Sequence, residues 1–383
     1  MGKIYLLRHA EAEGNVYRRC HGQYDSLNTP RAEAQIAAVA KRFKDIPIKA
    51  VYTSDLKRAR HTAVAIAREH GLPLIYRRDI REIAMGEWED LPWGLLPREY
   101  AEGFEIWEKR PWECDFMGGE TSQEVIDRMT SAIKDIASQI GDDAAVVVSH
   151  GMAMRLFLCK ALSWPLEKIK EVGWCDNTAV SLVEVLKDGS MNVVFRNDNS
   201  HLSEESSTLG KQKWWRPRGA AAQDFNTWFR KVDLYKDEKM LEEFGRSFYE
   251  SAYGSDDGFD KAVFMRQIGE ASYENARAVT FANLSDEIVG LVFLDPKNGA
   301  RKGSGLIRML CLKNEYRGIG LGTQLIGQAV SVYREMGLDR IYANVSDTNE
   351  NAAGFYENAG FQRKESENRH TVYEKTIKIG NDD

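Results

Sequence analysis

Two histidines and two arginines each stand where an apolar run of this sequence ends. They are, in chain order, Arg8, His9, Arg58 and His150. Ligands of open α/β sheets bind outside the carboxyl ends of the strands, so these four side chains are expected together at one edge of a sheet. Guanidinium forks match the oxygens of a phosphate group, and a neutral imidazole can act as a nucleophile. The spacing therefore predicts a site that handles phosphate.

Short strands are needed to position these groups. The runs Ile4–Leu7, Ala50–Tyr52 and Val146–Val148 favour β structure and have the length of buried strands. Apolar residues with helical spacing follow at Ala32–Phe43 and Ser122–Ile140. Strands and helices that alternate in this way indicate an α/β domain.

Four motifs in the same order resemble those of the histidine phosphatase superfamily, in its phosphoglycerate-mutase-like families. They are Arg8-His9-Ala10, Ser54 through Ala59, Arg81-Glu82-Ile83 and Ser149-His150-Gly151. The resemblance covers roughly residues 1–210, and it implies a three-layer α/β/α domain of the phosphoglycerate-mutase-like fold. Two residues depart from the family pattern: Ala10 replaces the usual glycine, and Ala12 stands where serine or threonine is common.

The resemblance implies phosphomonoester hydrolysis through a phosphohistidine, without a metal. His9 would attack phosphorus, and Glu82 would protonate the leaving alkoxide and then activate water. Arg8 and Arg58 would bind and neutralise the transferring oxygens, and His150 would donate a hydrogen bond to them. The implied phosphate- and substrate-binding residues are Arg8, Asn15, Gln23, Arg58, His150 and Gly151.

The stretch from Trp88 to Phe116 is rich in aromatic residues and resembles an inserted lid over the strand ends. These aromatic side chains line a substrate pocket or form a small core of the lid itself, and the sequence leaves both open. The fingerprint is shared by phosphatases and mutases, and a mutase would keep the phosphohistidine and rephosphorylate its product. Phosphoglycerate-mutase-type transfer is therefore the alternative activity.

The length of 383 residues exceeds what a single hydrophobic core usually needs, so two domains are expected. The stretch 197–210 is rich in Asn, Ser and Glu, which marks a loop or linker. We place the boundary close behind it, near residue 216. The predicted domains are residues 1–216 and residues 217–383.

The composition limits the class of protein. A net charge of −6 argues against a broad nucleic-acid-binding surface. The five cysteines are scattered and contain no C-x-x-C pair, so neither a disulfide framework nor a zinc site is expected, and a cytoplasmic location is favoured. No apolar run reaches membrane-spanning length, and the first residues lack a signal-peptide pattern. No metal ligands are predicted.

The second half contains its own phosphate-binding pattern. A strand is expected at Leu306–Leu312 and a helix at Thr323–Met336, with the glycine-rich turn Arg317–Gly322 between them. Glycines let backbone N–H groups approach an anion, and the helix N-terminus adds a favourable potential. The turn lacks the Gly-Lys-Ser/Thr of a P-loop and the Gly-x-Gly-x-x-Gly of a Rossmann turn.

The pattern Arg317-Gly-x-Gly-x-Gly, followed by Asn349 through Phe361, resembles the GNAT acetyltransferase superfamily over roughly residues 220–380. The resemblance implies an α+β acyltransferase domain with acetyl-CoA as donor, and its general base is not identified among Glu274, Glu315 and Glu350. Tyr356 would protonate the departing thiolate, and the alternative is that it is a packing residue. The implied coenzyme-binding residues are Leu310, Leu312, Arg317, Gly318, Gly320, Gly322, Asn349 and Tyr356.

The two resemblances together imply a bifunctional enzyme that hydrolyses phosphate esters and transfers acetyl to an amine. Its expected partners are a small-molecule phosphate ester and a small-molecule or peptide amine, with neither nucleic acid nor membrane. The pairing also raises the hypothesis that both halves act on one small metabolite. The alternative is that one half is retained only as a binding or scaffold module. The oligomeric state is not indicated.

Overall fold

The computed structural model describes residues 1–212, 225–297, 303–367 and 369–380. Two compact units make up the chain. The first consists of Met1–Asn15, Cys20–Leu91 and Leu96–Ala222, and the second of Val16–Arg19, Pro92–Leu95 and Gln223–Asp383. The predicted boundary between residues 216 and 217 lies outside the described residues.

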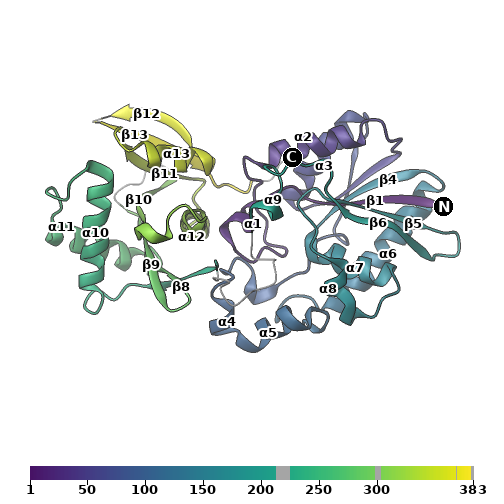
Figure 1. The fold of residues 1–383 in the computed structure, drawn as a ribbon, viewed down its shortest axis with the longest axis horizontal. Helices are drawn as coiled ribbons and strands as arrows, with labels where there is room; N and C mark the ends of the chain where they lie inside the picture. The colour runs from purple at the N-terminus through teal and green to yellow at the C-terminus, as the bar shows by residue number, and fades with distance from the viewer. Residues whose placement is uncertain (213–224, 298–302, 368, 381–383) are drawn as a thin grey trace. The chain divides into compact units, whose positions relative to one another are not determined.

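The first unit is built on a six-stranded sheet with the order β3-β2-β4-β1-β5-β6 (Figure 1). Its strands are β1 (Gly2–Arg8), β2 (Ala50–Ser54), β3 (Leu74–Arg77), β4 (Ala144–Ser149), β5 (Val180–Val185) and β6 (Met191–Asp198). The first four strands run parallel, whereas β5 is antiparallel to both β1 and β6. Arg8 pairs with Ser149, so β1 and β4 end level with each other, as the sequence predicts.

Helices cover both faces of this sheet. The helices of residues 1–212 are α1 (Glu13–Tyr17), α2 (Ala32–Phe43), α3 (Lys57–Glu69), α4 (Leu96–Glu99), α5 (Ala101–Lys109), α6 (Ser122–Ile140), α7 (Gly151–Ala161), α8 (Ile169–Val172) and α9 (Thr208–Lys211), with 3₁₀ turns η1 (Gly86–Trp88), η2 (Pro111–Glu113) and η3 (Leu166–Lys168). Apolar residues of α2 and α3 pack against the face that presents Leu7, Val51 and Val148. Helices α6 and α7 contact each other and β1. Because successive residues of a strand face opposite sides, this produces the predicted three layers.

Local signals explain why several predicted bounds agree with the structure. Helix α6 begins where Thr121 accepts a hydrogen bond from the Glu124 N–H while the Glu124 side chain accepts one from Thr121 N–H, which is a capping box. Strand β5 begins only after Thr178, because that residue has a φ of 61° and cannot be part of a strand.

The aromatic stretch between η1 and η2 forms a small core of its own. The ring of Trp88 lies 5.0 Å from Phe116 and 5.9 Å from Tyr100, centroid to centroid, and Trp107 also contacts Phe116. Trp88 and Phe116 are buried. These contacts favour the packing interpretation for these aromatic residues over a substrate-lining one.

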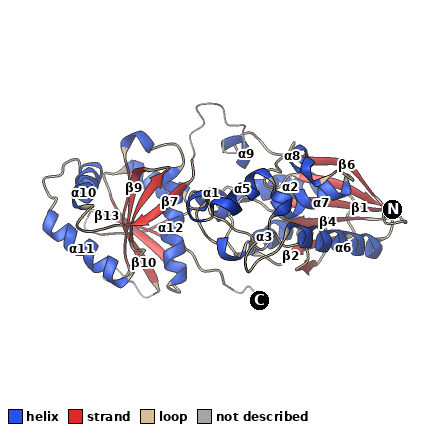
Figure 2. Cartoon of the chain, turned by 90° about the horizontal axis from the view of Figure 1, so that it is seen from below, coloured by secondary structure: helices blue, strands red, loops and turns tan. Residues whose placement is uncertain are grey.

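The second unit contains a seven-stranded sheet with the order β12-β13-β11-β10-β9-β8-β7. Its strands are β7 (Thr227–Lys231), β8 (Val279–Leu284), β9 (Glu287–Asp295), β10 (Ser304–Leu312), β11 (Arg340–Ser346), β12 (Gln362–Glu367) and β13 (His370–Thr376). Its helices are α10 (Glu238–Tyr253), α11 (Lys261–Glu274), α12 (Leu321–Glu335) and α13 (Glu350–Asn358), with a 3₁₀ turn η4 (Asn314–Tyr316). Figure 2 shows α10 and α11 on one face of this sheet and α12 on the other.

Strands β10 and β11 are paired over only part of their length. Strands β10 and β11 are parallel, and they pair only from Ser304 opposite Arg340 to Ile307 opposite Ala343. Both strands continue beyond these residues, and β10 is irregular between Ile307 and Met309. The backbone of β10 that faces β11 after this point therefore has no ladder partner in β11.

Helix α11 and the outer strands β7, β12 and β13 are among the elements that the sequence does not predict. Strand β12 reads Gln-Arg-Lys-Glu-Ser-Glu, which lacks the apolar alternation of a half-buried strand, because it lies at the edge of the sheet. Among the described residues, no helix has both the length and the apolar character that crossing a membrane requires.

Candidate active sites

His9 lies immediately after β1, and one of its ring nitrogens is hydrogen-bonded to the backbone. Its Nδ1 is 2.7 Å from the carbonyl oxygen of Ala10, which can only accept, so Nδ1 carries the proton and Nε2 keeps its lone pair. The backbone is fixed as well, because His9 N–H donates to the Ser149 carbonyl at 3.0 Å. The side chain is only 4% exposed. This environment holds a neutral imidazole in one tautomer.

His150 follows β4 and lies against His9, with 5.1 Å between the ring centroids. It is fully buried, and neither of its ring nitrogens has a hydrogen-bond partner among the described residues. The buried Nε of Arg8 is likewise without a partner there. Buried polar groups are nearly always satisfied, so these three atoms mark a place for a ligand with several acceptor oxygens.

Arg58, in the first turn of α3, is held by a loop of the chain. Its guanidinium donates to the carbonyl oxygens of Tyr24 at 3.0 Å and Gly22 at 2.7 Å. Glu89 holds the same loop from the other side, because its carboxylate accepts from the N–H groups of Gly22, Gln23 and Tyr24 at 2.7–3.1 Å. Arg58 is almost completely buried. Its charge is therefore fixed before any ligand arrives.

Burial and these cations set the charge state of the two histidines. Burial, then Arg58 and Arg8, lowers the pKa of His9 well below its usual value. Burial, then Arg58 and His9, does the same to the pKa of His150. Both rings are therefore neutral at neutral pH, which is the state a nitrogen nucleophile requires.

Glu82 approaches the same place from the loop after β3. Its carboxylate accepts from the N–H groups of Met152 at 3.0 Å and Ala153 at 2.8 Å, in the first turn of α7. A helix N-terminus stabilises a carboxylate, and this one begins directly after His150. Gly151 leaves room there, since a Cβ at that position would stand 3.3 Å from Arg8 Nε. The structure thus brings Glu82 and Gly151 to the two histidines.

The remaining predicted phosphate- and substrate-binding residues lie at the border of this site. The amide of Gln23 donates to the Glu82 carbonyl at 3.2 Å, and Asn15 Oδ1 accepts from Ala12 N–H at 2.9 Å. Ala10, in place of the usual glycine, does not have a positive φ, so alanine causes no backbone strain there.

Asn177 is a site residue that the sequence analysis does not name. Its Nδ2 donates to the His9 carbonyl at 2.9 Å and approaches Asn15 Oδ1 at 3.4 Å, while its own buried Oδ1 has no partner among the described residues. The polar run Asp176-Asn177-Thr178, shortly before the β-favouring run Val180–Val185, is the signal that could have pointed to it.

A depression of about 590 Å³ adjoins the loop that holds Arg58. Its lining residues are Gln23, Tyr24, Ala84, Gly86, Glu87, Glu89, Met117 and Gly118. A neutral, buried histidine beside fixed arginines, a second neutral histidine and a carboxylate can carry out phosphoryl transfer, and this depression offers space for the rest of a substrate.

In the second unit, the turn before α12 has the backbone of an anion site. Gly318 has a φ of 75° and Gly320 a φ of 90°, and a Cβ built on either would meet open space. Gly320 is the N-cap of α12, so the first free N–H groups of the helix lie at this turn. Arg317 ties the turn to β10, because its Nε donates to the Leu312 carbonyl at 3.0 Å.

Two further contacts order the neighbourhood of this turn. A Cβ on Gly322 would lie 2.7 Å from the Phe355 ring, so glycine lets α13 pack closely against α12. Asn349 caps α13, since its Oδ1 accepts from Ala352 N–H at 3.0 Å, and its Nδ2 donates to the Ser251 carbonyl at 3.1 Å.

Tyr356 lies in α13 among aromatic rings. The ring centroids of Phe361 and Phe355 lie 5.0 and 5.2 Å away, and burial raises the pKa of the Tyr356 phenol. The phenol therefore keeps its proton at neutral pH and has one to give, although the same rings make it a packing residue. Leu310 and Leu312 lie on the part of β10 that has no ladder partner in β11.

These residues fit a coenzyme A thioester. Backbone N–H groups at Gly320 and the start of α12 suit a pyrophosphate, and the unpaired edge of β10 suits the amides of a pantetheine arm, which can pair with a strand edge.

Comparison with known families agrees with both geometries. The model of the histidine phosphatase superfamily (branch 1) matches residues 4–199, and that of the acetyltransferase (GNAT) family matches residues 238–361. The chain belongs to the histidine phosphatase superfamily, and its C-terminal half carries a GNAT domain. The two resemblances in the sequence are confirmed.

Individual relatives match the first half of the chain. Phosphoserine phosphatase 1 of Hydrogenobacter thermophilus is 31% identical over 205 residues, which are 53% of this chain and 96% of that protein. A probable phosphoglycerate mutase GpmB of Escherichia coli is 33% identical over 169 residues, or 43% of this chain and 77% of that protein. The solved structure of Bacillus stearothermophilus YhfR is 26% identical, with a TM-score of 0.51 over 52% of this chain and 99% of that one.

Proposed function

We propose that the chain is a bifunctional enzyme, with a histidine-dependent phosphomonoesterase in the first unit and an acetyl-CoA-dependent N-acetyltransferase in the second. The observation that carries the first activity is the pair of neutral rings at 5.1 Å, with Nε2 of His9 free and both nitrogens of His150 without a partner among the described residues. A phosphoryl group between these rings and Arg58 would accept hydrogen bonds from Arg8 Nε and from the one protonated nitrogen of His150, and would lie next to the nucleophile.

The proposed hydrolysis has two steps. Nε2 of His9 attacks phosphorus, the bond from phosphorus to the ester oxygen breaks, and Glu82 gives its proton to the leaving alkoxide. Glu82 then removes a proton from water, the water oxygen attacks phosphorus, the bond from phosphorus to Nε2 of His9 breaks, and inorganic phosphate leaves. Arg8 and Arg58 neutralise the transferring oxygens in both steps, and the neutral His150 ring donates a hydrogen bond to them.

Small phosphorylated metabolites are the substrate class that we propose. The depression of about 590 Å³ beside Gln23 and Tyr24 has the size of a small-molecule site. The relatives bear the names phosphoserine phosphatase and probable phosphoglycerate mutase, which makes mutase-type transfer the alternative. The outcomes differ in product, because a phosphatase releases inorganic phosphate whereas a mutase returns an isomeric ester.

The second activity is carried by the open glycine turn before α12 and the unpaired edge of β10. A free amine would attack the thioester carbonyl, and Tyr356 would protonate the departing thiolate. The structure does not identify any of the three carboxylates considered in the sequence as the general base for the amine. Glu274 is paired with Lys297 at 2.7 Å, and Glu315 and Glu350 are exposed.

A metabolite screen tests both proposals. Phosphorylated metabolites are incubated with the full chain, with and without acetyl-CoA, and phosphate and free thiol are measured. We expect phosphate release that the His9→Ala variant lacks, and thiol release that this variant keeps. Phosphate release that is equal in both proteins would contradict the histidine-dependent mechanism.

The same screen decides whether the two halves share a metabolite. The amine acceptor is identified first, and its phosphorylated and acetylated forms are then tested with the first unit. If neither form is hydrolysed, the shared-metabolite proposal fails while both separate activities stand.

A further inference from the structure

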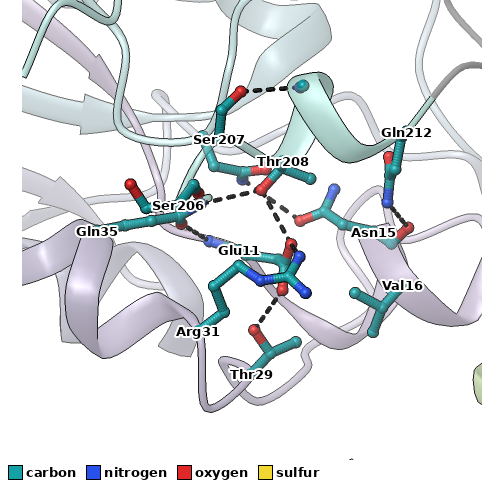
Figure 3. Close-up of polar contacts among 12 residues, drawn as sticks. Glu11, Asn15, Val16, Thr29, Arg31, Gln35, Ser206, Ser207, Thr208 and Gln212 are labelled. Carbon is teal, nitrogen blue, oxygen red and sulfur yellow. Dashed lines mark hydrogen bonds and ion pairs between the residues drawn. The ribbon is translucent and has the colours of Figure 1, made fainter. Parts of the chain in front are cut away.

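A segment that follows the matched phosphatase residues lies against the loop that carries His9. This segment, Ser206–Gln212, is called the strap below, and it contains α9 (Figure 3). It lies beyond residue 199, where the match to the histidine phosphatase family ends. Its last residue already reaches the loop, because Gln212 Nε2 donates to the Asn15 carbonyl at 2.9 Å.

The strap contributes to the environment of a buried carboxylate two residues after the proposed nucleophile. Glu11 is 1% exposed. Its side-chain donors are Thr29 Oγ1 at 2.6 Å, Arg31 Nη1 at 3.0 Å and Thr208 Oγ1 at 3.0 Å. Gln35 completes the arrangement, since its Oε1 accepts from Glu11 N–H at 2.7 Å and its Nε2 donates to Thr208 Oγ1 at 2.9 Å (Figure 3). A buried charge is costly unless it is hydrogen-bonded, so the Thr208 hydroxyl helps to fix Glu11.

The strap also contacts a second buried carboxylate, that of Asp176. Asp176 is 2% exposed, and its donors are uncharged groups. Two of them come from the strap: Ser207 Oγ at 2.6 Å and Leu209 N–H at 3.1 Å. Asp176 directly precedes Asn177, whose side chain donates to the His9 carbonyl at 2.9 Å.

We propose that the strap is a positioning element of the phosphoryl-transfer site, with Thr208 and Ser207 as its positioning residues. The inference rests on the proposed phosphatase function. Thr208 acts through Glu11 on the chain after His9, and Ser207 acts through Asp176 and Asn177 on the His9 carbonyl. In-line attack requires the nucleophile to lie within a fraction of an ångström of its productive position. Looser anchoring of this loop should therefore lower the rate of phosphoryl transfer.

The strap offers a matched set of variants in the full chain. Thr208→Val keeps the shape of the side chain and removes its hydroxyl, and Thr208→Ser restores the hydroxyl. Ser206→Ala is the control, because the Ser206 hydroxyl contacts Ser203 and not the His9 loop. We expect Thr208→Val to lower kcat by about tenfold, the rate equivalent of one hydrogen bond to a charged group, with little change in KM. Thr208→Ser and Ser206→Ala should stay within about twofold of the parent.

Amide hydrogen exchange over residues 9–15 provides a readout that does not depend on activity. Faster exchange there in Thr208→Val, with normal acetyl transfer and rescue by serine, supports the proposal. The proposal is overturned if Thr208→Val has the kcat and the hydrogen exchange of the parent. It is also overturned if Thr208→Val loses melting temperature and rate in parallel and Thr208→Ser restores neither. If the parent hydrolyses no phosphomonoester, the proposed function fails, and the exchange over residues 9–15 alone decides whether the strap anchors the loop.

Discussion

The two candidate sites of this chain differ in whether side chains or backbone groups form them. The site of the first unit consists of side chains, and His9, Arg58 and His150 are all buried. The site of the second unit consists mainly of backbone, at exposed glycines of the turn before α12. Side chains in a buried place have their charges set by neighbours, whereas a backbone site depends on φ and ψ.

The two sites should therefore lose activity through different kinds of substitution. Deleting one side chain of the first site should stop its chemistry, because each group has one role and a fixed neighbour. The turn of the second site should instead respond to changes in backbone conformation, and only Tyr356 there resembles the side chains of the first site. Substitutions in each site and a change of pH can test this contrast.

Replacing His9 by alanine should reduce phosphate release to background and leave acetyl transfer unchanged. The imidazole is the only proposed nucleophile, and the acetyl-transfer residues belong to the other unit. The measurement is steady-state release of phosphate and of thiol by one preparation. His61→Ala is the matched control, because His61 is a half-exposed histidine that contacts Asn28 and Glu33. Parallel loss of both activities would contradict the separation of the two sites.

Replacing Tyr356 by phenylalanine should slow acetyl transfer by about 10²-fold while coenzyme A still binds, because the ring keeps its packing and loses only the hydroxyl group that donates the proton. Single-turnover kinetics and binding of coenzyme A measure the two quantities. Tyr373→Phe serves as the control, since Tyr373 stacks on Tyr356 and its hydroxyl contacts Glu357. An unchanged chemical step in Tyr356→Phe would make Tyr356 a packing residue.

Replacing Gly320 by alanine should raise the KM for acetyl-CoA by about tenfold. A positive φ costs alanine about 1–2 kcal/mol, and relief of this strain would move the N–H groups of the turn. Gly337→Ala is matched to it, because Gly337 lies just past the other end of α12 with a φ of 74° and open space at its Cβ. Both variants should lose similar stability, measured by chemical denaturation. Equal KM values in the two would show that the turn does not bind the coenzyme.

Acid should destabilise the first unit more than the second. Burial is the largest cause that lowers the pKa of His9, His21, His150 and His201, and all four lie in the first unit. In the unfolded chain such residues bind protons near pH 6.5, while in the folded state they stay neutral to lower pH. Their contribution to stability is therefore complete above pH 6.5 and is lost as the pH falls below it.

Hydrogen exchange between pH 7.5 and 5, corrected for the intrinsic rate, measures this effect. Protection in β4 should fall more than protection in β9. A second expectation concerns the nucleophile. Because the pKa of His9 is lowered, its imidazole stays unprotonated to lower pH than an ordinary histidine. The acidic limb of kcat/KM for phosphate release should therefore have its midpoint below pH 6.5. A midpoint at or above that value would contradict the proposed electrostatic setting.

Much of the fold follows from local signals in the sequence. Helices α2 and α6 have the predicted bounds, because both combine helical apolar spacing with a clear end, and α6 has a capping box. The apolar runs that end at Arg8, His9 and His150 are enough to predict one shared edge of a sheet. Strand β12 and helix α11 cannot be predicted from local signals, because an edge strand or a weakly amphipathic helix forms only through contacts with its neighbours.

The contacts that tune the sites are the part that the sequence does not reveal. Glu82 can be placed by motif order, but its hydrogen bonds to the first turn of α7 join residues about 70 positions apart. Asn177 and Thr208 act across still longer separations. Their residue types are common in loops, so only the folded chain distinguishes a hydroxyl on a buried carboxylate from one in solvent.

The most direct test of the central claim is the identification of the phosphorylated residue. The full chain is mixed briefly with a phosphomonoester that the screen has identified, quenched in alkali, and mapped by mass spectrometry. We predict an acid-labile phosphoryl group on His9 that is absent from His9→Ala and present in Tyr356→Phe. A phosphoryl group on another residue, or full turnover by His9→Ala, would contradict the proposed mechanism.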